Sequence, residues 1–179
     1  MPENAVTKLK RSALIHYIDE GFSPEVTDFK SIIWFLIGKD VEDLAVNLNP
    51  QTTTKKNILD ETTVDDEGYE PEFDVDTYYA DPSDGPFYEK IKDIAMNRLT
   101  GDACKTRVLE VLVDKTQAPF YAWVEDVIIK PQSYGGAQGG VRIPYKVAYC
   151  GNRKQGTVTL VDKVPTFTAA AETTTTTTD

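Results

Sequence analysis

The stretch Val141-Arg142-Ile143-Pro144-Tyr145-Lys146-Val147-Ala148-Tyr149 decides the fold class of this 179-residue chain. Its odd-numbered positions are all apolar or aromatic, and Arg142 and Lys146 lie in the opposite phase. Because alternate side chains of a strand point to opposite faces, a period of two predicts a β-strand with one buried face. This stretch has the clearest strand pattern in the sequence.

Strand patterns recur along most of the chain. Ile32 to Ile37 is apolar in both phases, so we expect this strand to be covered on both sides. Leu44, Val46 and Leu48 alternate with small or polar residues, which is also typical of a strand. The strand that contains Ile32 to Ile37 is predicted to begin at Ser31 and to end at Ile37. The other predicted strands are Arg11 to Ile18, Arg107 to Val113, Phe120 to Ile129 and Gln155 to Val161.

One helix interrupts the strands. Asp84-Gly85-Pro86 offers an acid and a proline suited to a first helical turn, and Gly101, after Arg98, suits a C-terminal cap. Between them a core-facing apolar stripe has helical spacing: Phe87, Tyr88, Ile91, Ile94, Ala95 and Leu99. The predicted fold is therefore mainly β, sandwich-like or barrel-like and mostly antiparallel, with one flanking α-helix at about residues 86–99.

The charge of the chain is concentrated in one segment. There are 19 Lys and Arg against 29 Asp and Glu, a net charge of −10, which argues against a protein that grips nucleic-acid phosphates. Of the 29 acidic residues, 11 lie between Asp60 and Asp84, where no Lys or Arg occurs. The rest of the chain contains the other 18 acidic residues and all 19 basic residues, so it is nearly neutral.

Within this acidic segment, Tyr69 to Thr77 has the alternation of a strand. Tyr69, Phe73 and Val75 fall on one face, and four carboxylates fall on the other: Glu70, Glu72, Asp74 and Asp76. Pro71 lacks a ladder donor and therefore belongs at a sheet edge or near the strand start. The acidic face is a solvated edge, the wall of a cavity or channel, or a hard-cation site, although Asp65-Asp66-Glu67-Gly68 lacks the spacing of a calcium loop.

No constellation of catalytic residues is visible. His16 is the only histidine and lies inside an apolar strand, and no phosphate-binding, zinc-protease or nucleophile-elbow motif occurs. Cys104 and Cys150 are far apart in sequence, which indicates two reduced thiols rather than a disulfide framework or zinc site. We therefore predict that the protein is not an enzyme and has no catalytic residues, no metal site and no cofactor.

The ends of the chain differ from its centre. We expect residues 1–10 to be a flexible segment without a secretory signal, 11–163 to be one β domain, and 164–179 to be a disordered tail with six threonines from Thr173 to Thr178. The domain contains a long polar excursion at 50–68 and a glycine-rich hairpin tip at Tyr134 to Gly140. No stretch is apolar enough to insert into a membrane. We expect the chain to be made and folded in a cytoplasm.

The motifs resemble, in order and spacing, the major tail tube proteins of long-tailed bacteriophages and prophages of Gram-positive bacteria. The resemblance runs from about Lys10 to Asp162. It is carried by Trp34-Phe35-Leu36-Ile37-Gly38-Lys39-Asp40-Val41-Glu42-Asp43-Leu44, Asn49-Pro50, Gly68-Tyr69-Glu70-Pro71, Thr77-Tyr78-Tyr79-Ala80, Leu99-Thr100-Gly101-Asp102, Glu125-Asp126-Val127-Ile128-Ile129, Ser133-Tyr134-Gly135-Gly136 and Gly151-Asn152-Arg153.

This resemblance implies a structural virion protein that self-assembles into stacked hexameric rings, a hollow tail tube built in the host bacterial cytoplasm. Expected partners are copies of itself, a tape-measure protein, and tail terminator or baseplate proteins; DNA transits without specific binding. Two alternatives remain open. One is another tail component, namely a terminator, baseplate or sheath subunit, and the other is a surface-displayed β binding domain.

The resemblance also gives the acidic face a role. A lumen lined by Glu70, Glu72, Asp74 and Asp76 would repel phosphates and let DNA slide. The family places a long loop between early strands, so the expected ring-to-ring contacts lie in the excursion at Gln51, Lys55, Lys56, Asn57, Asp65 and Asp66. A second set of expected contacts lies in the glycine-rich tip at Tyr134, Gly135 and Gly136.

Overall fold

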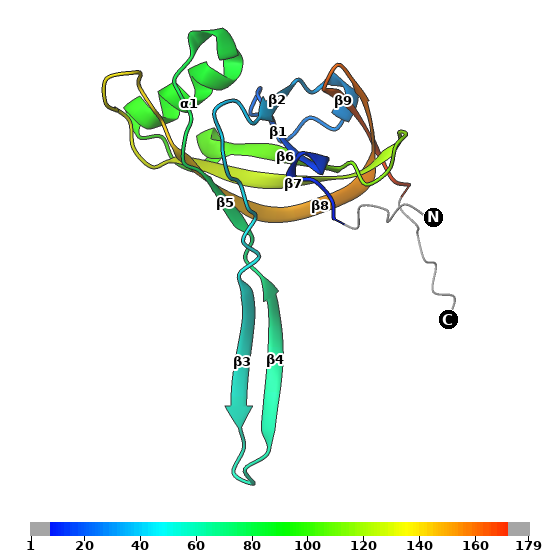
Figure 1. Cartoon of the computed structure of the whole chain (residues 1–179). Helices are drawn as coiled ribbons and strands as arrows, with labels where there is room; N and C mark the ends of the chain where they lie inside the picture. The colour runs from blue at the N-terminus through cyan, green and yellow to red at the C-terminus, as the bar shows by residue number, and fades with distance from the viewer. Residues whose placement is uncertain (1–7, 172–179) are drawn as a thin grey trace. The chain divides into compact units, whose positions relative to one another are not determined.

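The structure is a computed structural model, and it describes residues 8–171. It confirms the predicted class, because the described chain is mostly antiparallel β-structure with one α-helix (Figure 1). The flexible segment predicted at residues 1–10 lies largely outside the described residues, as does the threonine run from Thr173 to Thr178.

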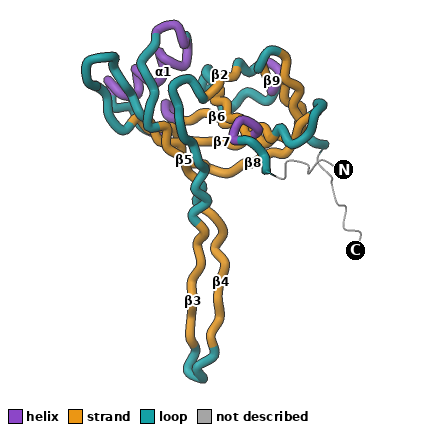
Figure 2. The backbone as a smooth tube through the Cα atoms, viewed as in Figure 1, coloured by secondary structure: helices purple, strands orange, loops and turns teal. Residues whose placement is uncertain are grey.

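Within residues 8–171, nine strands form two sheets, and Figure 2 shows their course. The larger sheet has the order β2-β1-β6-β7-β8-β5, with β9 also paired to β8, and the smaller sheet contains only β3 and β4. The strands are β1 Leu14–Asp19, β2 Trp34–Ile37, β3 Pro50–Lys56, β4 Thr62–Tyr69, β5 Glu72–Val75, β6 Lys105–Leu112, β7 Phe120–Pro131, β8 Tyr145–Val161 and β9 Val164–Ala169. The helix α1 spans Pro86–Asn97.

The chain divides into two compact units, where the sequence predicted one domain over 11–163. The first unit comprises Met1–Ile37, Thr106–Asp126 and Gly151–Asp179, and the second comprises Gly38–Lys105 and Val127–Cys150. β7 and β8, with 12 and 17 residues, each pass through both units. Strands of this length can contribute to two separate apolar clusters, which alternation along a sequence does not reveal.

The first unit is built around the strand pairs β1–β2, β1–β6 and β8–β9. Its buried apolar cluster is Tyr17, Leu109, Val111, Ala122, Val124, Val158 and Phe167. The Tyr17 hydroxyl donates a hydrogen bond of 2.8 Å to the Lys163 carbonyl, and burial raises the pKa of Tyr17 to about 12. This bond ties β1 to the turn between β8 and β9.

The second unit packs α1 against aromatic residues, as the sequence predicted. Phe87 and Ile91 are fully buried, and Ile94 and Ala95 complete the stripe. The ring of Tyr78 lies 5.4 Å from that of Phe87 and 5.9 Å from that of Tyr145, both in edge-to-face geometry. The helix ends at Asn97, because Arg98 adopts the left-handed conformation that was expected of Gly101 and its N–H reaches the Ile94 carbonyl.

The hydroxyl of Tyr145 has no hydrogen-bond partner among the described residues, and the side chain is 1% exposed. Burial, and then the nearby Tyr78 and Asp84, raise the pKa of this hydroxyl. We predict that Tyr145→Phe increases the free energy of unfolding by about 1 kcal/mol, because a buried hydroxyl without a partner is costly. Urea unfolding at about pH 8 measures this change.

The same variant tests the sign of the alkaline dependence. Because the pKa of Tyr145 is higher in the folded protein, the hydroxyl ionises more readily in the unfolded chain above about pH 10, so the stability of the parent falls as the pH rises toward the raised value. Tyr145→Phe should therefore lose less stability between about pH 8 and about pH 11 than the parent does. Tyr78→Phe is the control, since its hydroxyl donates to Asp84 Oδ2 at 3.1 Å and its removal should destabilise. Burial raises the pKa of Tyr78 as well, so the two variants are compared by their stability at about pH 8, where equal effects would contradict this account.

Three strand predictions differ from the structure. β2 is an edge strand that is only half-buried, and Ile33 beside it is 68% exposed. The prediction that this strand is covered on both sides is therefore wrong for the single chain. Leu44 to Leu48 forms no strand; Asn47 makes a single bridge to Glu72. The strands predicted at Val141 to Tyr149 and Gln155 to Val161 are one strand, which starts after Pro144 because proline lacks a ladder N–H.

Two boundaries also differ. The disordered tail was predicted to start at residue 164, but Val164–Ala169 forms β9, in which Phe167 is 1% exposed and so anchors the strand in the core of the first unit. Tyr69 was placed on the same buried face as Phe73 and Val75, yet it ends β4 and is 63% exposed. Gly68 with φ of +93° and Pro71 separate β4 from β5, so the alternation does not continue across them.

Candidate assembly interface

The polar excursion at 50–68 is a two-stranded hairpin. β3 and β4 pair antiparallel from Pro50↔Tyr69 to Lys56↔Thr62, with a bulge between Gln51 and Thr52. None of the residues from 50 to 70 is buried. Within the second unit the ribbon runs out from the segment that leads into β5 (Figure 1).

Polar contacts at its surface hold the hairpin together. Lys55 Nζ lies 2.7 Å from Asp65 Oδ2, and the Thr53 hydroxyl donates to Glu67 Oε1 at 2.7 Å. At the turn, Asn57 Oδ1 accepts bonds from the backbone N–H groups of Leu59 and Glu61, at 2.9 and 3.0 Å. Exposed pairs of this kind contribute little, and an isolated two-stranded sheet is marginally stable in water. The hairpin therefore gains most if a partner covers it.

The predicted contact residues of the excursion all lie on this hairpin. β3 carries Gln51, Lys55 and Lys56, Asn57 opens the turn, and β4 carries Asp65 and Asp66. The tip itself was not predicted as a contact, although Ile58 is 101% exposed and Leu59 is 73% exposed there. Two adjacent apolar residues within an otherwise polar stretch were the available signal. Contact of these residues with another subunit remains a prediction.

Two of the carboxylates on the acidic face of β5 have polar partners. In β5, Phe73 and Val75 are buried, and Glu72 and Asp74 lie on the other face. Glu72 Oε2 lies 2.7 Å from Lys146 Nζ, and Asp74 Oδ1 accepts a bond of 2.8 Å from Gln132 Nε2. The hydrogen bond to Glu72 raises the pKa of Lys146. β5 ends the larger sheet, as Pro71 predicted.

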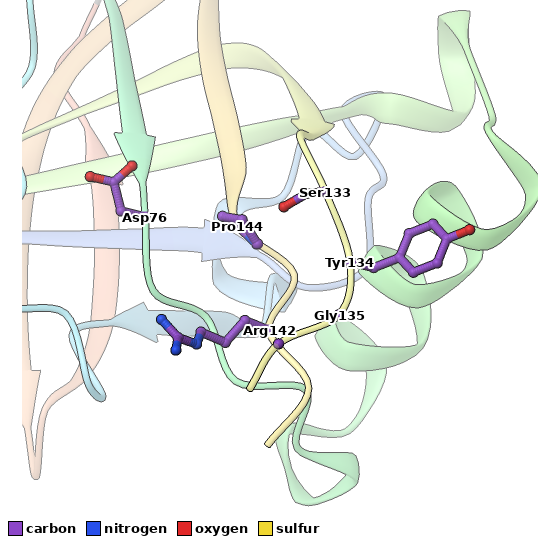
Figure 3. A pocket seen from close by; sticks show the side chains of 7 residues that line it. Asp76, Ser133, Tyr134, Gly135, Arg142 and Pro144 are labelled. Carbon is purple, nitrogen blue, oxygen red and sulfur yellow. The ribbon is translucent and has the colours of Figure 1, made fainter. Parts of the chain in front are cut away.

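The glycine-rich tip brings residues of both predicted sets together (Figure 3). Tyr134, Gly135 and Gly136 line an open pocket of about 250 Å³ with Asp76, and Ser133, Arg142 and Pro144 complete it. Gly135 and Arg142 exchange two backbone hydrogen bonds, of 3.1 and 2.6 Å, which fix the loop beside the start of β8. Gly136 is required here, because a Cβ would lie 2.5 Å from the Gly140 carbonyl oxygen. Glu70 lies outside this group.

An ion cluster in the first unit, formed by two buried carboxylates and a partly exposed arginine, was not predicted. Arg153 Nη1 and Nη2 each lie 2.7 Å from a carboxylate, on Glu125 and Glu110 respectively, which are 7% and 8% exposed. His16 Nε2 lies 3.6 Å from Glu110 Oε1. Burial alone would lower the pKa of Arg153, but the hydrogen bonds and charges of Glu125 and Glu110 raise it. The signal in the sequence was Glu110, the one acid inside the apolar run of β6.

The described residues contain no group of three or more His, Cys, Asp or Glu placed to hold a metal ion. No helix in the described part of the chain is both long and apolar enough to span a membrane. Cys104 is buried, with its thiol 3.3 Å from the Leu99 carbonyl, and Cys150 is exposed; neither forms a disulfide. The absence of catalytic residues and cofactors remains a prediction.

Comparison with known proteins gives similarities of structure only. No family model matches the chain, and no curated protein matches it. The sheath/tube terminator of the extracellular contractile injection system PVC, in its extended state, aligns with a TM-score of 0.49 and 9% identity over 84% of this chain and 99% of that chain. The tube-terminating cap of the anti-feeding prophage aligns with a TM-score of 0.47 and 10% identity, covering 86% and 93%.

Proposed function

We propose that this protein is a structural subunit of a phage-tail-like particle and assembles with copies of itself into rings. The observation that carries the proposal is the β3–β4 hairpin, an ordered ribbon in which no residue is buried. A chain stabilises such a ribbon most effectively by covering it with another subunit. The resemblance of the sequence to tail tube proteins, with their long loop between early strands, supports the same proposal.

The open ends of the larger sheet support self-association as well. β2 and β5 end the strand path, and the outer edge of β5 is paired only by the bridge between Glu72 and Asn47 in the described chain. Ile33 beside β2 is 68% exposed. A free edge with apolar neighbours invites pairing with another chain, and closing a ring of subunits removes such edges. The half-buried apolar residues of β2 thus gain the cover that the sequence predicted for them, but from a neighbouring subunit.

Two positions in such a particle are proposed. One is the tube subunit, whose rings stack on copies of themselves into a conduit for DNA ejection, with tape-measure, terminator and baseplate proteins as partners. The alternative is a terminator or cap, which forms a ring at the end of a tube. The terminator agrees better with the two solved proteins named above. Either position implies a virion tail location after assembly in the host bacterial cytoplasm.

Negative-stain electron microscopy over a concentration series, with size-exclusion chromatography of the same samples, tests the proposal. Tubes of growing length identify a tube subunit, since a head-to-tail interface along the axis does not close. Single rings that never elongate identify a terminator or cap. A protein that stays monomeric at every concentration, and also when mixed with tail tubes, overturns the proposal.

The acidic lumen is part of this proposal and predicts a gain of DNA binding. Glu70 and Asp76 flank β5 and are exposed, so Glu70→Lys with Asp76→Lys reverses charge without opening the core. Assemblies of this double variant should retain short duplex DNA at ~50 mM salt and release it by ~200 mM, whereas the parent retains none. Fluorescence anisotropy of labelled DNA measures the difference.

The matched control is Glu42→Lys with Asp43→Lys, an equal charge change at two exposed acids outside the acidic segment. These variants should form the same assemblies and bind little DNA. Equal DNA binding by both double variants would show that net charge, and not the position of the charges, causes the binding. It would contradict the prediction that the lumen is lined by Glu70, Glu72, Asp74 and Asp76.

A further inference from the structure

We infer that the hairpins of neighbouring copies pair edge to edge, with β3 of one copy against β4 of the next, so that a ring carries a closed collar of hairpin strands. This inference rests on the proposed ring assembly and deepens it. The hairpin then makes its contact within a ring, whereas the resemblance predicts a contact between rings.

Both outer edges of the hairpin are open. β3 pairs only with β4, so each strand has one side without a strand partner in the described chain. The Asn57 N–H donates to the Glu61 carbonyl, and antiparallel pairs alternate between bonded and non-bonded. By this alternation Thr54 and Lys56 on β3, and Val64 and Asp66 on β4, direct their backbone N–H and C=O groups outward. These groups are the donors and acceptors of a further strand.

The two open edges carry opposite charge. β3 contains Lys55 and Lys56 and no acid, whereas β4 contains Asp65, Asp66 and Glu67 and no base. Lys55 is already paired with Asp65 inside the hairpin. No salt bridge within the described residues uses Lys56 or Asp66, and both are exposed. A β3 edge against a β4 edge brings these two opposite charges together, while like edges would repel.

Rotational symmetry permits this contact and closes it. In a ring with rotational symmetry, hairpins that lie parallel to the axis all point the same way, so that β3 of one copy and β4 of the next run antiparallel, as β3 and β4 do within a hairpin. The contact uses different patches on the two partners, and such a heterologous contact forms a closed ring when the rotation closes. Closure removes every free edge of the hairpins.

Charged residues on an edge also serve to keep strands apart, and lysine is typical of protected edges. That role is best filled when both edges carry charge of the same sign, because either edge of one copy then repels both edges of another copy. Here the second edge is acidic and would neutralise the first. The split of charge between β3 and β4 therefore favours selective pairing over general repulsion.

Mixed disulfide cross-linking tests the collar. The chain is used in full with Cys150→Ser, which removes the exposed thiol. Thr54→Cys in one preparation is mixed with Val64→Cys in another, because the two positions face each other within a hairpin and would otherwise link inside one chain. The mixture should yield a disulfide-linked dimer that neither preparation forms alone. Since closure staggers neighbouring strands, Asp66→Cys is tested as a second β4 partner.

Thr53→Cys mixed with Val64→Cys is the matched control, because Thr53 lies on the opposite face of the hairpin and should not link. Links within one preparation, or equal linking by Thr53→Cys, overturn the collar. Rings or tubes without the mixed link overturn the collar and leave the proposed function standing. Mixed dimers that never form rings support the edge contact and overturn the proposed function.

Charge exchange gives a second readout that does not depend on thiols. Lys56→Glu or Asp66→Lys alone should raise the concentration for half-maximal assembly about tenfold, and both together should restore it. Lys90→Glu on the exposed side of α1 is the control, because it changes the net charge by the same amount as Lys56→Glu but lies outside the hairpin. It should leave the concentration for half-maximal assembly unchanged. Failure of the double variant to recover would count against the β3–β4 pairing.

Discussion

Arg153→Met is expected to lower the free energy of unfolding by about 2 kcal/mol. The variant keeps most of the side-chain volume but leaves the carboxylates of Glu110 and Glu125, 8% and 7% exposed, without the guanidinium that lies 2.7 Å from each. Because the Arg153 side chain is itself 43% exposed, water reaches the vacated site, and the loss is smaller than that for a fully buried ion pair. Urea unfolding followed by far-UV circular dichroism measures the change.

The contribution of charge can be separated from that of packing. Glu110→Gln and Glu125→Gln added to Arg153→Met should restore part of the stability, because two neutral amides then replace the two carboxylates that faced the guanidinium. Lys154→Met, the neighbouring exposed cation, is the control and should change little. A triple variant that is no more stable than Arg153→Met would indicate packing rather than charge.

Gly156→Ala is expected to destabilise the first unit by at least about 2 kcal/mol. A Cβ at this position would lie 2.3 Å from the Thr168 carbonyl oxygen and 2.6 Å from the Phe167 ring. Gly156 pairs with Ala169 across the β8–β9 ladder, and Phe167 packs edge-to-face against Phe29 at 5.2 Å. The backbone of β9 cannot move away without withdrawing Phe167 from the core.

Hydrogen exchange of the β9 amides, measured beside global unfolding, reports this effect directly. β9 should exchange faster in the variant even where the rest of the first unit remains folded. Gly21→Ala is the control, because its nearest neighbour is the Asp19 side chain at 3.3 Å and it should cost less than about 1 kcal/mol. Equal losses in the two variants would contradict a specific close contact at Gly156.

These two variants and the hairpin variants separate folding from assembly. Arg153 and Gly156 lie in the first unit, whereas the β3–β4 hairpin belongs to the second unit and contains no buried residue. Changes at Thr54, Val64 or Lys56 should therefore leave the free energy of unfolding within about 0.5 kcal/mol of that of the parent while they change assembly. A ring defect in a hairpin variant can then be attributed to the contact between subunits.

The sequence predicted those parts of the fold that depend on local periodicity. The stripe of Phe87, Ile91 and Ile94 identified α1, because residues three and four apart share a helix face. Alternation identified β6, β7 and the buried face of β5 for the same kind of reason. Pro71 identified β5 as an edge strand, since a proline has no ladder N–H to offer.

Periodicity could not locate the ends of continuous strands or the partners of charged residues. The two strands predicted on either side of Cys150 are one strand because pairing with neighbours, and not local alternation, decides where a strand continues. Val164–Ala169 was assigned to the tail because it adjoins the threonine run, and only its pairing with β8 shows it to be a strand.

The sequence by itself therefore determined the class of the fold, the place of the helix, the acidic segment and the hairpin as candidate surfaces. Only the tertiary structure decided that Glu110, Glu125 and Arg153 meet across three strands, that Lys146 and Gln132 partner half of the acidic face, and that β2 is a half-covered edge. Local propensity acts between residues a few positions apart, whereas burial and charge pairing depend on contacts between residues distant along the chain.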